Sequence, residues 1–355
     1  MKNKVKRILK KRPIRRKKVS ESLEQAIKGI PRITNETVAE HREEVLSSAR
    51  KYIYPLQHSA HRVVIISITL LVAGIIAFFT YCLLALYKFQ SSSTFIYRIS
   101  QVIPFPVAKA GSRFVSYENY LFELRHYIHY YQTQQRVDFN SDSGKQQLAE
   151  FRKRAMDMVI DYAYVNEIAK KQHISVSDGE LNDAIRLVRS QNRLGSNNQV
   201  FEDVLKEFWG WSVSDFKREL RQQMLEEKVV STLDTETHKR AANVYDQVIA
   251  GGDFAALAKQ YSDDLATKDN GGSYGYVISP SDRNLPPEVI DALFKMKVGD
   301  VSKVISTGTS LEIIKLNQKD GDKVQASHIS FAFKPITTYT DSLKAKNKPH
   351  LFIGQ

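Results

Sequence analysis

Two clusters of residues have types and spacing that suggest metal or phosphate chemistry. His126 and His129 lie one helical turn apart beside Glu123, a spacing that could make a metal-binding pair. A metal site also needs a third ligand and there is no obvious one, so the competing interpretation is a solvated helix face, and we expect no metal. The stretch 261–277 has glycines that permit tight turns but no Gly-Lys-Ser/Thr, which excludes a phosphate-binding loop. Neither cluster predicts a cofactor.

A single cysteine limits redox chemistry. Cys82 lies inside an apolar run, so the residues after that run have no disulfide framework and their folding depends on core burial. No cleavage signal precedes Cys82, which argues against a lipoprotein anchor. About 268 residues follow the run, and a composition of 42% apolar and 10% aromatic residues is typical of packed cores. That length suffices for two ordinary domains.

Residues 63–87 form an uncharged apolar stretch between Arg62 and Lys88. These 25 residues, as an α-helix, extend for about 37 Å and would cross a hydrocarbon core of about 30 Å with some tilt. Soluble core helices seldom keep so long an uncharged run, and a signal peptide is shorter and begins nearer the N-terminus. We therefore predict a single membrane-spanning helix.

The distribution of charge orients this helix. Residues 1–62 hold 17 Lys and Arg against 6 Glu, so +11 of the chain's net charge of +13 lies before the span. By the positive-inside rule the basic tail stays in the cytoplasm and the residues after the span are extracytoplasmic. The basic run 2–18 has no interleaved aromatic residues. We expect it to contact anionic inner-leaflet lipid or to be a solvated, disordered run, and we expect no nucleic acid.

The exported part begins with a predicted spacer and continues as helices. Serines, prolines and a glycine punctuate residues 88–112, which indicates an extended stand-off linker. In residues 113–234 apolar side chains recur at steps of three and four, the period of amphipathic helices. Ser177 with Glu180 predicts a capping box, and Ser212 predicts the cap of the last helix.

Two segments of this helical region have distinctive capped openings: VNEIAKKQHISVSDGELNDAIRLVRSQNRL and FEDVLKEFWGWSVSDFKRELRQQMLEEKVV. They resemble the N-terminal chaperone domain of SurA- and PrsA-type extracytoplasmic folding factors. The resemblance covers roughly residues 113–233. It implies an all-α domain that binds unfolded polypeptides.

Residues 235–334 combine helices, a glycine-rich loop and two apolar strands at 301–305 and 310–316. Ordered matches to one family occur at Gly252, Asp253-Phe254, Leu257-Ala258, Tyr261-Ser262, Asp264, Lys268, Gly271-Gly272, Gly275, Pro287-Glu288, Ala292, Phe294, 297–302 and 313–315. This order closely resembles the parvulin, or PpiC-type, peptidyl-prolyl isomerases. The resemblance implies an α+β domain with an FKBP-like antiparallel sheet and no cofactor.

The same resemblance implies roles for individual residues. Asp264 falls on the family position beside the peptide carbonyl, and Leu285 and Val289 fall on its pocket methionine and phenylalanine. Glu312 occupies the position of a family histidine in the last strand, which is a departure that bears on catalysis. Further substrate contacts are implied for Phe294 and Tyr274.

The family's first strand, which carries a histidine, is missing from its place before the first helix. Residues 324–333, VQASHISFAF, have the pattern of that strand and follow a hairpin turn at Asp320-Gly321. We predict that the hairpin brings His328 beside Glu312 in a circularly permuted parvulin sheet. The competing interpretation is that residue 324 begins a second parvulin unit of which only one strand exists.

The resemblance implies a folding factor anchored in the plasma membrane by one span: a peptidyl-prolyl cis–trans isomerase and chaperone for newly exported polypeptides with Xaa-Pro bonds. Asp264 and His328 favour this enzyme. Glu312 and Val289 favour the alternative, a holdase that binds extended clients without turnover, and a scaffold for a surface assembly is a third possibility. Residues 335–355 are predicted to form a C-terminal tail.

Overall fold

The computed structural model describes residue 28 and residues 33–53, 56–191 and 197–354. The chain divides into two compact units, residues 1–80 and residues 81–355. The basic run 2–18, for which we predict a lipid contact or a solvated run, lies outside the described residues.

The described residues of the first unit lie almost entirely in helices. Helix α2 covers Asn35–Ile53, and α3 covers Leu56–Leu83 and continues as a π-helical turn, Leu84–Lys88. Within the described part of the chain one helix, His61–Lys88, is long and apolar enough to cross a membrane, and none of its apolar window is buried by protein. A helix satisfies its own backbone hydrogen bonds, which is what a lone segment needs in lipid.

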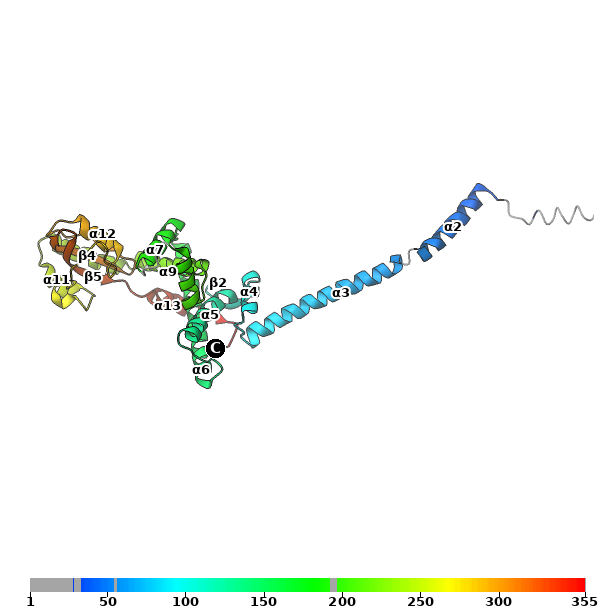
Figure 1. The fold of residues 1–355 in the computed structure, drawn as a ribbon, viewed down its shortest axis with the longest axis horizontal. Coiled ribbons are helices and arrows are strands. Elements are labelled where there is room, and N and C mark those ends of the chain that lie inside the picture. The colour runs from blue at the N-terminus through cyan, green and yellow to red at the C-terminus, as the bar shows by residue number, and fades with distance from the viewer. Residues whose placement is uncertain (1–27, 29–32, 54–55, 192–196, 355) are drawn as a thin grey trace, which may run out of the picture. The chain divides into compact units, whose positions relative to one another are not determined.

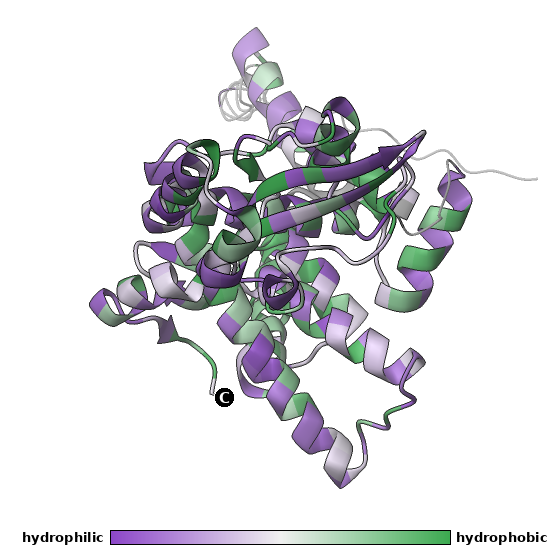
Figure 2. Cartoon of the chain, turned by 90° about the vertical axis from the view of Figure 1, so that its left-hand side faces the viewer, coloured by the Kyte–Doolittle hydropathy of each residue, from purple (hydrophilic) through white to green (hydrophobic). Residues whose placement is uncertain are grey.

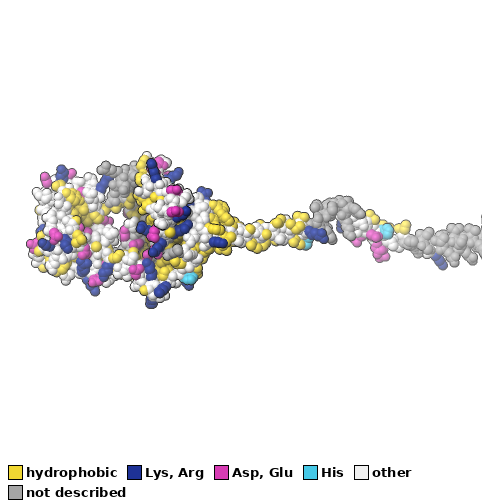
Figure 3. Space-filling model, turned by 90° about the horizontal axis from the view of Figure 1, so that it is seen from below, with side chains coloured by type: hydrophobic (Ala, Val, Ile, Leu, Met, Phe, Trp, Pro, Cys, Tyr) yellow, Lys and Arg dark blue, Asp and Glu magenta, His cyan; other side chains and the backbone are white. Residues whose placement is uncertain are grey.

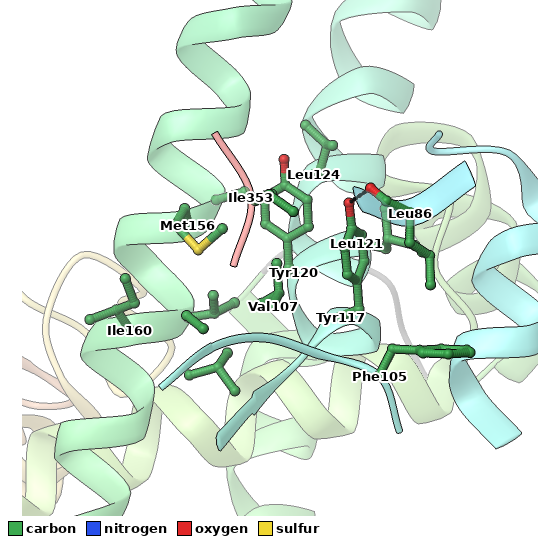
Figure 4. Packing of buried hydrophobic residues seen from close by; sticks show 14 of the residues in the cluster. Leu86, Phe105, Val107, Tyr117, Tyr120, Leu121, Leu124, Met156, Ile160 and Ile353 are labelled. Carbon is green, nitrogen blue, oxygen red and sulfur yellow. Dashed lines mark hydrogen bonds between the residues drawn. The ribbon is translucent and has the colours of Figure 1, made fainter. Parts of the chain in front are cut away.

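The end of the apolar run belongs to the core of the second unit. Cys82, Ala85 and Leu86 are buried in one hydrophobic cluster with residues as distant as Met156 and Ile353. The Tyr117 hydroxyl donates to the Leu86 carbonyl at 2.6 Å, the bond drawn in Figure 4. The last turns of the predicted span are therefore part of the second unit.

Residues 88–112 differ from the extended linker that we predict there. They contain helix α4 (Thr94–Val102), capped by the Ser93 side chain, and strand β1 (Pro106–Ala110). Pro106 is the first residue of the strand, a position that tolerates proline because it need not donate to the ladder. Phe105 and Val107 are buried, so apolar packing outweighs the spacer-like composition.

The helical domain follows. It contains β2 (Arg113–Ser116), α5 (Tyr117–Thr133), α6 (Asp142–Lys171), α7 (Asp178–Gln191), α8 (Asn198–Val204) with a π-helical turn (Leu205–Trp209), and α9 (Val213–Leu233). The predicted capping box is confirmed, because Ser177 N–H donates to Glu180 and Glu180 N–H donates to the Ser177 hydroxyl. The predicted Ser212 cap is confirmed as well, by its bond to Asp215 N–H.

The C-terminal residues return to this domain and do not form a separate tail. Helix α13 (Thr337–Lys346) packs on α6, and strand β6 (His350–Leu351) pairs with β1, which gives a sheet in the order β2-β1-β6. Figure 1 shows this red segment beside the green helices of the domain. The domain is therefore helical with a small sheet, and the prediction of an all-α domain is wrong in this respect.

Residues 234–334 form a second domain inserted between α9 and α13. Its elements are α10 (Thr235–Ile249), α11 (Phe254–Tyr261), a 3₁₀ turn (Lys268–Asn270), α12 (Pro287–Lys295), β3 (Ile305–Ser306), β4 (Ser310–Asp320) and β5 (Lys323–Ala332). At its base Lys334 N–H donates to the buried Asp234 carboxylate at 2.9 Å, and Asp234 also caps α10. This bond ties the entry of the inserted domain to its exit.

The predicted hairpin is confirmed. Strands β4 and β5 pair antiparallel over their length, with Ile314 opposite His328 and Glu312 opposite Ser330, in a sheet ordered β3-β4-β5. Side chains alternate between faces along a strand. Leu311, Ile313, Ile329 and Phe331 share one apolar cluster with α10 and α11, whereas Ile314, Leu316, Val324 and Ala326 share another with α12. Figure 2 shows the mixture of hydrophobic and hydrophilic residues along the two long strands.

Glu123 gives a prediction about stability. It is buried on α5, and burial, with the nearby charge of Glu219, raises its pKa to about 8. A carboxyl whose pKa is raised by folding destabilises the native state as pH rises from its unfolded pKa of about 4.3 toward the folded value. We expect the helical domain to lose on the order of 3 kcal/mol of unfolding free energy between pH 5.5 and 8.5.

Glu123→Gln should remove most of this loss, whereas the exposed Glu150→Gln on α6 should leave it unchanged. The pH dependence of the unfolding free energy is measured by urea unfolding followed by tryptophan fluorescence. Both tryptophans, Trp209 and Trp211, lie in this domain. An equal pH dependence in Glu123→Gln would contradict the assignment.

Candidate active site

A cluster of charged and hydroxyl side chains lies on one face of the β4–β5 hairpin. Because Glu312 is opposite Ser330, and His328 is two residues from Ser330, all three project from the same face as the apolar residues that α12 covers. Glu312 and His328 are diagonal cross-strand neighbours. The predicted hairpin therefore does bring them together.

His328 is held by carboxylates at both ring nitrogens. Its Nδ1 lies 2.8 Å from Glu312 Oε2, and its Nε2 lies 2.9 Å from Asp264 Oδ2. The Thr267 hydroxyl also lies 2.9 Å from Nε2, so polar side chains surround both ring nitrogens. The Tyr274 ring stacks on His328 with centroids 4.3 Å apart and covers one of its faces.

Asp264 comes from the loop that follows α11. Its Oδ1 accepts from Ala266 N–H at 3.0 Å, and its Oδ2 accepts from the Thr267 hydroxyl at 2.6 Å. Partial burial alone would raise the pKa of Asp264, but the hydrogen bonds from Thr267, Ala266 and His328 outweigh it and lower the pKa below its ordinary value. The site therefore keeps Asp264 ionised.

Gly272 sets the distance between this loop and the hairpin. His328 N–H donates to the Gly272 carbonyl at 2.8 Å. A Cβ at position 272 would lie 2.1 Å from the His328 carbonyl oxygen, and the backbone there has a φ of 76°. Only glycine permits so close an approach in that conformation.

Glu312 is buried, and each of its two oxygens has a hydrogen-bond partner. Its Oε1 accepts from the Ser310 and Ser330 hydroxyls, each at 2.8 Å, while Oε2 faces His328. A buried charge needs such partners, because the desolvation of an unpaired carboxylate is costly. Sequence reasoning missed Thr267, Ser310 and Ser330. The hairpin register could have indicated Ser330, because it is the residue opposite Glu312.

The predicted substrate-contact residues are divided between the site and the core. Tyr274 is partly exposed against His328, and Leu285 and Phe294 are partly buried against the cluster beneath α12. Val289 is only 1% exposed, which does not agree with a role in contacting substrate. It faces the core because α12 turns that side toward the sheet.

The two histidines of the candidate metal pair make different contacts. His129 Nε2 is 2.9 Å from the Glu207 carbonyl oxygen, and His126 stacks on Trp211 with centroids 4.6 Å apart. Glu123 is buried near Glu219. In residues 33–53, 56–191 and 197–354, no group of three or more His, Cys, Asp or Glu is arranged to hold a metal ion.

Two family models match the chain, one for each domain. Residues 224–318 match the PPIC-type PPIASE domain, and residues 56–230 match the SurA-like N-terminal domain. The first match ends before β5, the strand that carries His328.

Curated relatives match across both domains. The foldase protein PrsA of Caldanaerobacter subterraneus is 30% identical over 207 residues, which are 54% of this chain and 67% of that protein. PrsA of Clostridium botulinum is 28% identical over 50% of this chain and 63% of its own length, and PrsA 2 of Bacillus cereus is 26% identical over 53% and 65%. The chain thus spans about two thirds of the length of these relatives.

In the family matches, as in the structure, the helical domain precedes the isomerase domain. The resemblance inferred from the sequence is confirmed. With a SurA-like helical domain followed by a PpiC-type peptidyl-prolyl isomerase domain, the chain belongs to the PrsA-type family of parvulin foldases.

Proposed function

We propose that this protein is a membrane-anchored extracytoplasmic foldase that catalyses cis–trans isomerisation of Xaa-Pro bonds in newly exported polypeptides. The observation that carries the proposal is the His328 imidazole held between Asp264 and Glu312 on the parvulin-like sheet. The family membership supports the same activity.

The chemistry needs no covalent step. An Xaa-Pro amide resists rotation because resonance places negative charge on its carbonyl oxygen and double-bond character on C–N, with a barrier of about 18–20 kcal/mol. A fixed anion beside that oxygen disfavours the planar amide more than the twisted one, in which the charge has left the oxygen. Asp264 is the group that supplies this anion. His328 positions it, and Glu312 positions His328.

The surface around Asp264 suits an extended apolar segment. Leu265 is 78% exposed, and Tyr276 and Val277 are exposed on the loop after Tyr274. The Tyr276 ring lies 6.4 Å from the Tyr274 ring, which in turn covers His328. Exposed apolar residues next to a polar cluster favour binding of a proline and its neighbours.

The position of β5 supports a circular permutation. We infer that β5 occupies the place of the first strand of the parvulin, FKBP-like sheet, because it pairs antiparallel with β4 and carries a histidine into the site. The isolated bridges of Ser273 with Ser327 and of Ile278 with Val324 join the glycine-rich loop to the same strand.

The location follows from the apolar helix and the basic tail. We infer that residues 63–81 cross the plasma membrane, that the tail stays in the cytoplasm near anionic inner-leaflet lipid, and that the two domains are extracytoplasmic. The helical domain would bind unfolded clients while the inserted domain acts on their prolines.

Asp264→Asn tests the enzyme, because it removes the charge and keeps the size. We expect kcat/KM for a proline peptide to fall about tenfold or more, which corresponds to about 1.4 kcal/mol of transition-state stabilisation. The measurement is a peptide isomerisation assay on the full chain in nanodiscs. Asp269→Asn, an exposed aspartate in the same segment, is the matched control and should keep wild-type activity.

The competing function is a holdase that binds clients without turnover, favoured by the carboxylate of Glu312 where the family has histidine. A wild-type chain that slows client aggregation but does not accelerate isomerisation would establish it. Equal rates in Asp264→Asn and the wild type would also contradict the role of Asp264.

The topology has its own test. A protease added to intact cells should degrade an epitope placed after residue 354 and spare one placed at residue 1, because the +11 tail is held inside. Protection of the C-terminal epitope would reverse the orientation.

A further inference from the structure

The apolar run is longer than its membrane part needs to be. From Val63 to Tyr81 an α-helix extends for about 28 Å, which already matches a hydrocarbon core of about 30 Å. Of the residues that follow, Cys82, Ala85 and Leu86 are buried in protein, whereas Leu83 and Leu84 are exposed. Tyr81 therefore marks the boundary at which the helix passes from lipid into the exported domain, which deepens the proposed membrane anchoring.

Hydrogen bonds join the segment after Tyr81 to the rest of the second unit. Ser91 N–H donates to the Ala85 carbonyl at 2.9 Å, and the Tyr87 hydroxyl donates to the Pro106 carbonyl at 2.6 Å. Together with the bond from Tyr117 to Leu86, these contacts fix the end of the helix to β1 and α5. The residues that directly follow Tyr81 are therefore part of the packed structure of the second unit.

That surface exposes large apolar side chains. Tyr81 is 52% exposed, Phe89 67%, Phe95 58% and Val102 82%. The Tyr81 and Phe95 rings are neighbours, with centroids 6.3 Å apart. Figure 3 shows hydrophobic side chains along the apolar helix and on the surface of the second unit. Exposed aromatic residues in such a group mark an interaction surface.

The spacing and charge of these residues fit a lipid surface. On α4, Phe95, Arg98 and Val102 follow one another at steps of three and four residues, so they share the outer face of the helix, opposite the buried Ile96 and Ser100. Apolar side chains with a long basic one between them are typical of helices that lie in the membrane interface, where Arg reaches the phosphates. Tyrosine at the hydrocarbon boundary is typical of the aromatic belt.

We propose that α4, together with Tyr81 and Phe89, forms a docking face that inserts into the interfacial layer of the extracytoplasmic leaflet. The occupant is the lipid surface itself. The helical domain is thereby held against the membrane at the end of the span, and the inserted isomerase domain is attached through it.

Depth-dependent fluorescence quenching tests the docking face. The native cysteine is first removed from the full chain by Cys82→Ala. Four variants then each carry one new cysteine, in place of Phe95, Val102, Ile76 or Val298. Each variant is labelled with bimane and placed in nanodiscs that hold one protein molecule. Val298 is 57% exposed in the inserted domain and is the matched control. Unchanged tryptophan emission shows that each helical domain is folded.

We expect lipids with a nitroxide near the headgroup to quench the labels at residues 95 and 102 at least threefold more than the label at residue 298. Nitroxides deep in the chain should quench the label at residue 76. Quenching at 76 without quenching at 95 and 102 would overturn the docking face and leave the anchoring intact. If the labels at residues 95 and 102 are shielded from solvent only when a nanodisc holds two protein molecules, the occupant of this face is a second copy of the chain. That result would also overturn the lipid-docking face. No quenching at 76 would overturn the anchoring and the docking face together.

Discussion

The structure of the candidate site depends on one constraint: a carboxylate that is buried in a protein must be paired. Glu312 lies in the sheet with almost no exposure, and three donors, from Ser310, Ser330 and His328, satisfy it. The need for these donors fixes the register of the hairpin, because a slip by one residue would turn His328 to the other face. His328 in turn fixes Asp264, which is the one carboxylate of the group that is partly open to solvent.

A second consequence of the fold is that the isomerase domain is an insertion. The helical domain uses residues from both ends of the second unit, since Ile353 packs in the same cluster as Leu86 and Tyr117. The bond between Lys334 and Asp234 closes the base of the insertion. The helical domain and the end of the apolar helix thus share one core, whereas the sheet that holds the site has apolar clusters of its own.

Local signals in the sequence predict the parts of the fold that local physics determines. The capping box at Ser177 depends on residues three apart, and the pairing of His328 with Glu312 follows from a hairpin with a short turn, so both could be predicted. The pairing of β1 with β6 joins residues 108 and 351, and no local pattern records it. The spacer-like composition of 88–112 was misleading because distant apolar residues cover it. The burial of Val289 depends on how α12 lies on the sheet, which its sequence position does not reveal.

The central claim is that the charge of Glu312 acts through His328 on Asp264, and Glu312→Gln tests it most directly. Glutamine keeps the volume and can still accept from the two serines, but it withdraws the negative charge from Nδ1 of His328. Exchange NMR on a proline peptide separates kcat from KM. The account predicts a kcat about tenfold lower with KM changed less than twofold, since the apolar binding surface is untouched. A kcat equal to that of the wild type would contradict it.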